Sequence, residues 1–130
     1  MIKEILFIIN PNSGNKNGVD VIELIPKYLD KNKFKHSYSL TTHQKHAIEI
    51  AAKAAKDNID IVVAVGGDGL VNEVFQSLVN TNVAFSIIPK GSGNGIARSL
   101  GVNMNIKNAL KNINNLKSKK IDTVTFNGLL

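Results

Sequence analysis

The sequence contains no cysteine and no tryptophan, and only three prolines among 130 residues. Without cysteine the chain can form neither disulfides nor cysteine-ligated metal centres. With only five phenylalanines and two tyrosines, it lacks the aromatic platforms on which single-stranded nucleic acids stack. No apolar run approaches the roughly 20 residues that span a bilayer, and the apolar stretch 5–9 is too short for a signal peptide. We therefore expect an intracellular, cytoplasmic protein.

Positive charge is in excess: 16 Lys+Arg stand against 10 Asp+Glu, a net charge of +6. Such an excess favours anionic partners, among them nucleotide phosphates and an anionic membrane surface. The lysines are spread along the chain, and the densest basic cluster is the short stretch 117–120. Because aromatic residues are scarce as well, we do not expect a nucleic acid partner.

Short apolar runs alternate with amphipathic stretches along the whole chain. Apolar or alternating runs predict strands over 2–10, 34–40, 59–65, 83–89 and from 119 onward. Helical spacing predicts helices over 19–33, 42–58, 70–80, 95–101 and 106–116. Pro26 lies inside the first helix, where we expect a kink or an early start. Strands that alternate with helices form parallel sheets covered on both faces, so the sequence predicts an α/β fold with a three-layer, doubly wound parallel sheet.

Three glycine-bearing loops each follow a predicted strand: "NPNSG" (10–14), "GGDG" (66–69) and "PKGSGN" (89–94). Loops that follow parallel strands lie along the carboxyl edge of the sheet, where α/β proteins bind ligands at the point of strand-order reversal. We expect strand 2–10 on one side of strand 59–65, and strand 83–89 on its other side. The three loops should then meet at one edge.

The residues of these loops are typical of a phosphate site. Glycine lets an anion approach the backbone closely, and a helix N-terminus offers N–H groups and the positive end of the helix dipole. Asp68 adds a carboxylate, which beside a phosphate either accompanies a divalent cation such as Mg²⁺ or acts as a base. The alternative is that the glycines only form tight turns between strand and helix. The complete dinucleotide-binding and P-loop patterns are both absent.

In this order and spacing, "NPNSG", "GGDGLVNEV" (66–74) and "PKGSGNGIAR" (89–98) resemble the catalytic domain of the diacylglycerol kinase superfamily, which includes sphingosine and ceramide kinases. The resemblance covers essentially the whole chain. It implies a Rossmann-type nucleotide-binding domain like those of phosphofructokinases and NAD kinases, with ATP and Mg²⁺ as cofactors. It also implies phosphorylation of the hydroxyl of diacylglycerol or a sphingoid-type lipid. An NAD-kinase-like small-molecule kinase and a non-catalytic nucleotide-binding or interaction domain are the alternatives.

The same resemblance implies the site residues. Asp68 matches an aspartate that acts either as the base or in the magnesium–nucleotide network, and both roles stay open. Leu70 stands where the commonest motif has threonine, and Gly95 where it has aspartate, two departures that look like sphingosine and ceramide kinases. The positions that match the nucleotide-binding pattern are Asn10, Pro11, Ser13, Gly14, Thr41, Gly66, Gly67, Asp68, Gly69, Leu70, Asn72, Glu73, Gly91, Ser92 and Asn94.

Family members are longer, because a mostly β domain follows and supplies the lipid pocket. Residues 1–118 are therefore predicted to form the ATP-binding domain, and 119–130 the first strand of, or linker into, the second domain. We expect the isolated chain to be inactive on lipids, and the full-length enzyme to act transiently at a membrane surface. An apolar edge near Phe126–Leu130 is expected to allow homo-oligomers. We expect His43 and His46 to lie at a solvated helix start rather than to hold a metal.

Overall fold

The computed structural model describes residues 2–12, 19–89, 106–115, 118–121 and 124–127. Strands and helices alternate along these residues in the predicted order. The elements are β1 (Lys3–Ile9), α1 (Val19–Tyr28), β2 (Phe34–Leu40), α2 (His46–Lys56), β3 (Ile61–Gly66), α3 (Asp68–Leu78), β4 (Ala84–Pro89), α5 (Ile106–Ile113), β5 (Ser118–Ile121) and β6 (Val124–Asn127). The predicted helix over 95–101 lies outside the described residues.

The strands form one sheet in the order β2-β1-β3-β4-β6-β5. Strands β1 to β4 are mutually parallel, with Ile9 opposite Val65 and Val65 opposite Ile88. The predicted neighbours are confirmed: β1 lies on one side of β3 and β4 on the other. Chain order reverses between β1 and β3, so this fold has its switch point where the glycine turn follows β3.

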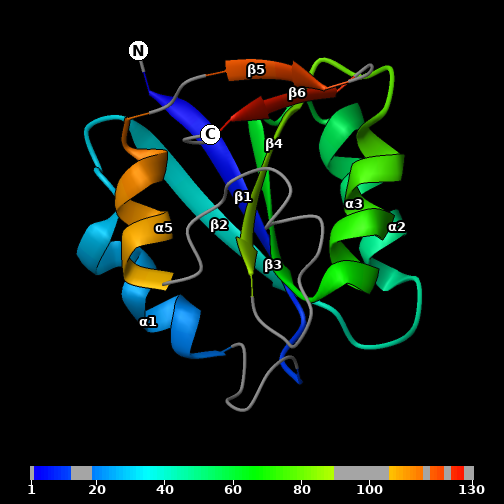
Figure 1. Ribbon diagram of the computed structural model, residues 1–130, viewed down its shortest axis with the longest axis horizontal. Coiled ribbons are helices and arrows are strands. Elements are labelled where there is room, and N and C mark those ends of the chain that lie inside the picture. The colour runs from blue at the N-terminus through cyan, green and yellow to red at the C-terminus, as the bar shows by residue number, and fades with distance from the viewer. Residues whose placement is uncertain (1, 13–18, 90–105, 116–117, 122–123, 128–130) are drawn as a thin grey trace.

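Two helical layers enclose the sheet, as Figure 1 shows, with α1 and α5 on one side and α2 and α3 on the other. All six residues of β3 are buried, and they alternate between the layers. Val62 and Ala64 pack in the core under α2 and α3. Val63 and Val65 pack in the core under α1 and α5. The three-layer, doubly wound fold predicted from the sequence is therefore confirmed.

Most element boundaries differ by a few residues from the prediction. Helix α1 continues through Pro26 but ends at Tyr28, rather than reaching residue 33. The helix therefore does not start at Pro26, and it tolerates the proline in its last turn, where few residues follow the lost donor. Helix α2 begins at His46 instead of residue 42. Its buried alanines, Ala47 and Ala51 among them, let the helix pack closely against α3 and β1.

The single strand predicted from 119 is instead two antiparallel strands, β5 and β6. Strand β6 also pairs in parallel with Ala84 and Phe85 at the beginning of β4. The hairpin therefore lies away from the carboxyl edge of the sheet, at the top of Figure 1. Because β6 has a partner strand on each side, it is not the free edge that we expected near Phe126, whereas residues 128–130 lie outside the described range. Among the helices of the described residues, none has the length and apolar character needed to cross a bilayer.

Candidate functional site

The carboxyl ends of β1, β2 and β3 are held side by side by backbone hydrogen bonds that continue beyond the strands. The N–H of Asn10 donates to the carbonyl of Val65 at 3.1 Å, and the N–H of Thr41 donates to the carbonyl of Ile9 at 2.9 Å. The register of the sheet thus places Asn10 and Thr41 beside the glycine turn that begins at Gly66. Residues from three separate segments therefore meet at this edge.

Asn10 and Gly66 form the centre of this edge. The Asn10 side-chain Oδ1 accepts the N–H of Asn12 at 3.0 Å, a local turn that directs the chain away from the sheet. A Cβ atom on Gly66 would lie 3.1 Å from Cδ2 of Leu70 and 3.6 Å from Cβ of Asn10. Packing therefore favours glycine at position 66, because a methyl group there would press on the side chain of Leu70, which would have to move by a few tenths of an ångström.

Helix α3 begins directly after this turn. Gly67 is its N-cap and makes no side-chain cap hydrogen bond, and Asp68 is its first residue. The N–H of Val71 donates to the carbonyl of Gly67 at 3.0 Å. Amides earlier in the first turn, such as that of Gly69, have no acceptor within the helix, and the positive end of the helix dipole lies there. This end of α3 is suited to an anion.

Gly69 differs from Gly66 in its surroundings. Among the described residues a Cβ atom on Gly69 would meet nothing within 4 Å, and its φ is not in the left-handed range that favours glycine. Glycine inside a helix is less favourable than alanine by about 1 kcal/mol. Neither packing nor backbone conformation thus accounts for Gly69, whereas the close approach of a ligand to the start of α3 would.

A groove of about 280 Å³ opens at this edge of the sheet. Its lining comes from the segments after β1 and β2 and from the first turns of α2 and α3. Five of its residues were predicted from the sequence: Asn10, Thr41, Gly69, Leu70 and Glu73. The others are Asn12, Thr42, His43, Gln44, Lys45 and Ala47. Amide, hydroxyl and charged side chains predominate, so the lining suits a polar ligand.

The remaining predicted site residues lie around the groove or beyond the described range. Pro11 adjoins Asn10, and Gly66, Gly67 and Asp68 adjoin Gly69 along the chain, while Asn72 is exposed on α3. None of these is among the residues that line the groove. The predicted residues outside the described range are Ser13, Gly14, Gly91, Ser92 and Asn94.

The structure gives a reason for Leu70, one of the departures from the commonest family motif. Its side chain is only 9% exposed and belongs to the core that α2 and α3 share with the sheet. The same side chain covers Gly66. Leucine at this position therefore joins the first turn of α3 to the core, although part of the residue also lines the groove.

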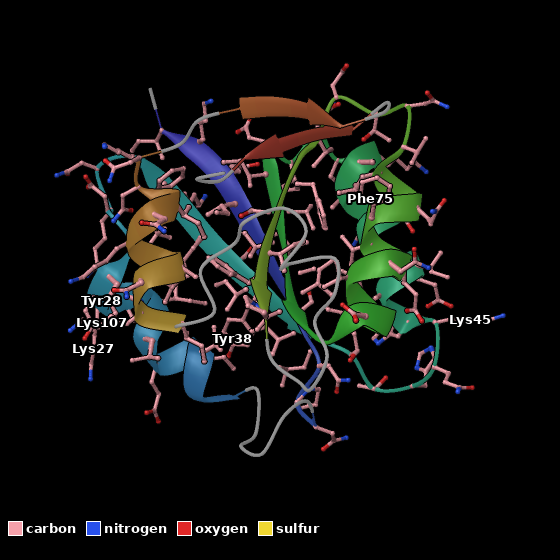
Figure 2. All side chains as sticks on the ribbon, in the orientation of Figure 1. Lys27, Tyr28, Tyr38, Lys45, Phe75 and Lys107 are labelled. Atoms are coloured by element: carbon pink, nitrogen blue, oxygen red, sulfur yellow. The ribbon has the colours of Figure 1, made fainter. Side chains whose placement is uncertain are left out.

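The loop from 41 to 45 contributes most of the lining residues that the sequence analysis missed. Of this loop only Thr41 was predicted, because the sequence signal for a phosphate site comes from glycine-bearing loops and this loop has no glycine. Lys45 nevertheless has a φ of 64°, a left-handed conformation that lysine rarely adopts. Figure 2 shows its side chain extending away from the sheet, at the start of α2. The feature that could have predicted this loop as part of the site is the sheet topology, because the carboxyl end of β2 lies beside that of β1.

His43 and His46 are stacked at the beginning of α2, with ring centroids 4.3 Å apart and planes inclined by 17°. Ligand atoms of His43, His46 and Glu49 all lie within 4.8 Å of one another, a grouping that could hold a metal. However, Nδ1 of His46 accepts the N–H of Thr42 at 3.0 Å. Nearly parallel rings also direct their nitrogen lone pairs side by side rather than toward one point. This geometry favours a hydrogen-bonded helix start over a metal centre.

Comparison with known proteins gives a family. The model of the diacylglycerol kinase catalytic domain matches residues 4–126. A diacylglycerol kinase of Bacillus subtilis is 29% identical over 130 residues, which are 98% of this chain and 43% of that protein. Sphingosine kinase B of Dictyostelium discoideum is 29% identical over 107 residues, which are 77% of this chain and 14% of that protein.

The fold is also similar to that of solved kinase structures. A crystal structure of a diacylglycerol kinase from Bacillus anthracis superimposes with a TM-score of 0.71 and 25% sequence identity, covering 89% of this chain and 44% of that one. The chain therefore spans less than half the length of each of these kinases. Because the family model matches nearly every residue, the chain belongs to the diacylglycerol kinase catalytic-domain family.

Proposed function

We propose that this chain is the nucleotide-binding part of an ATP-dependent lipid kinase. The observation that carries the proposal is Gly69. The fold leaves open space where its Cβ would be, at the start of α3 and beside the groove. Kinases of this family must bind the phosphates of their nucleotide. Among the described residues, the start of α3 at Gly69 is where backbone N–H groups, the positive end of the helix dipole and open space coincide.

The residues around the groove fit a magnesium nucleotide. Backbone N–H groups of the first turn of α3 would donate hydrogen bonds to phosphate oxygens, and Asn10 and Thr41 add a side-chain amide and a hydroxyl to the groove lining. A groove of about 280 Å³ is near the lower end of the usual range for ligand pockets, about 300–1,000 Å³. ATP would supply the phosphoryl group that is transferred, with Mg²⁺ neutralising part of the phosphate charge.

Asp68 is the residue that we assign to catalysis. It is the first residue of α3, is partly buried and adjoins Gly69 of the groove along the chain, which supports a role beside the bound phosphates although Asp68 does not itself line the groove. In this position it would either act on the magnesium–nucleotide complex or accept the proton of the acceptor hydroxyl. The base role requires a carboxylate at position 68, and the magnesium role is served better by a charged carboxylate than by a neutral amide.

The acceptor that we propose is the hydroxyl of diacylglycerol or of a sphingoid-type lipid. The groove lining is mainly polar, which suits phosphates and ribose better than acyl chains. Because the chain spans less than half of its relatives, we propose that the lipid pocket lies outside residues 1–130. Residues 1–130 would then bind nucleotide without phosphorylating lipid. The net charge of +6 would favour transient contact of the whole enzyme with an anionic membrane surface.

The first test uses residues 1–130. Mg-ATP or Mg-ADP should raise the melting temperature, because a ligand that binds only the folded state stabilises it. In ¹H–¹⁵N spectra the resonances of Asn10, Thr41 and Gly66–Gly69 should shift, while those of Lys107 and Lys111 on α5 serve as the internal control. Shifts confined to α5 would contradict the assignment.

The second test uses a family-length enzyme. Radiolabelled ATP is supplied with diacylglycerol, a sphingoid base, ceramide or NAD in parallel reactions. Phosphorylation of one of the lipids is expected. Label transferred to NAD alone would favour the small-molecule kinase, and binding without transfer to any acceptor would favour a non-catalytic nucleotide-binding domain. Lipid phosphorylation by residues 1–130 alone would show that the acceptor site lies within this chain.

A further inference from the structure

The loop that joins β2 to α2 forms one wall of the groove, through Thr41, Thr42 and the three residues that follow. Its beginning is held to the sheet, because the N–H of Thr41 donates to the carbonyl of Ile9 at 2.9 Å. Its far end enters α2 at Lys45, which has the left-handed φ of 64° and makes no side-chain cap hydrogen bond. The usual side-chain cap therefore does not hold this loop against the helix.

A side chain from inside the helix takes the place of that cap. Nδ1 of His46, the first residue of α2, accepts the backbone N–H of Thr42 at 3.0 Å and lies 3.3 Å from the Thr42 hydroxyl. The same hydroxyl lies 2.9 Å from Nδ1 of His43, whose ring stacks on that of His46. These contacts close the loop into a ring that runs from Thr42 to His46.

His46 itself is not among the residues that line the groove, whereas Thr42 is. Its ring is partly buried, and its acceptor nitrogen faces back toward the loop, away from the rest of α2. His46 can therefore act on a ligand in the groove only through the residues that it contacts, which are Thr42 by hydrogen bond and His43 by stacking. A hydrogen bond from a side chain to the backbone is a direct way to set the position of one residue in a loop.

We propose that His46 is a positioning residue for the nucleotide: by accepting the N–H of Thr42 it holds the 41–45 wall in the conformation that binds the ligand. This inference rests on the proposed nucleotide function of the groove. It predicts that what matters at position 46 is an acceptor at the place of Nδ1, and neither the charge nor the aromatic ring of histidine.

The chain offers a matched pair of variants at this position. In asparagine, Oδ1 is bonded to Cγ as Nδ1 is in histidine, so His46→Asn keeps an acceptor at the same place. His46→Leu puts a methyl group there and removes the acceptor. Both variants lose the stacking on His43, so the difference between them isolates the hydrogen bond to Thr42.

Two measurements on residues 1–130 are compared. The first is hydrogen exchange of the Thr42 amide without nucleotide, which should stay slow in His46→Asn and become faster in His46→Leu. The second is the Kd of Mg-ATP by calorimetry. A side-chain to backbone hydrogen bond should change affinity by about three- to ten-fold, so His46→Leu should bind that much more weakly and His46→Asn within about two-fold of wild type.

The outcomes separate the two proposals. Failure of the unaltered chain to bind Mg-ATP refutes the proposed function, and the positioning role with it. Wild-type binding together with equal Kd values for the two variants refutes the positioning role alone. In particular, if His46→Asn binds Mg-ATP as weakly as His46→Leu does, the positioning role is refuted, because the loss of the aromatic ring rather than of the acceptor would then explain the weaker binding. Matched melting temperatures for the two variants show that both are folded.

Discussion

Replacing Gly69 by alanine should stabilise the fold and weaken nucleotide binding, two effects of opposite sign from one methyl group. The part of the chain that the structure describes leaves room for the added Cβ, which would meet none of its atoms within 4 Å. Gly69 already lies in helix α3 and is exposed, so alanine keeps the backbone unchanged. If only the stability of the fold mattered at position 69, alanine would be more favourable there than glycine.

The size of each effect can be estimated. Alanine is better than glycine inside a helix by about 0.5–1 kcal/mol, which for a domain of this length raises the melting temperature by about 2–5 °C. Helical Cβ atoms tilt toward the helix N-terminus, so the new methyl group would point at an anion held by the first-turn amides. Steric overlap of this kind costs about 1–3 kcal/mol, so the affinity for Mg-ATP should fall by about five- to 150-fold.

The assay combines urea unfolding of the ligand-free chain with calorimetric titration of Mg-ATP. Gly66→Ala is the matched control within the same turn, since its Cβ would lie 3.1 Å from Leu70 and the variant should be destabilised. Gln76→Ala is the control for helix propensity, because Gln76 is exposed on α3 and does not line the groove. A stabilised Gly69→Ala variant that binds Mg-ATP as tightly as wild type would refute the reasoning, because phosphates would then not approach the start of α3.

Three further predictions follow from the same structure. Asp68→Asn in a family-length enzyme should abolish lipid phosphorylation in the radiolabel assay, while the loss of its charge at the helix start lowers stability by only about 0.3–1 kcal/mol; near-normal turnover would contradict a catalytic role. Phe85→Ala should lower the free energy of unfolding in urea by about 3–5 kcal/mol, because Phe85 is fully buried, whereas the partly buried Phe75 should lose less. Chelating Mg²⁺ with EDTA should shrink the rise in melting temperature caused by ATP without changing that of the ligand-free chain; an undiminished rise would exclude a metal in binding.

Much of the fold could be predicted because its signals are local and repeated. The apolar run of β3 indicates a strand buried on both faces, and all six of its residues are buried. The apolar face of α3 follows the helical period, with Val71, Val74 and Leu78 in the core. From the alternation of such segments the parallel, doubly wound sheet follows, and with it the expectation that loops after β1 and β3 share one edge.

The C-terminal hairpin could not be predicted in the same way. Strands β5 and β6 have four residues each, which is too short for a period of two to be distinguished from chance. Their pairing depends on β4 offering a partner to β6 at Ala84 and Phe85. Long-range hydrogen bonds of this kind leave little trace in the local residue pattern.

The sequence by itself determined the order of strands and helices from β1 to β4 and the turn after β3, because periodicity and glycine spacing act over a few residues. Tertiary structure alone brought the glycine-free loop 41–45 to the groove, since that depends on β2 pairing with β1. It also separated two glycines that look alike in "GGDG". A Cβ on Gly66 would press on Leu70, whereas Gly69 faces space beside the groove that is open among the described residues, and the way the chain packs decides that difference.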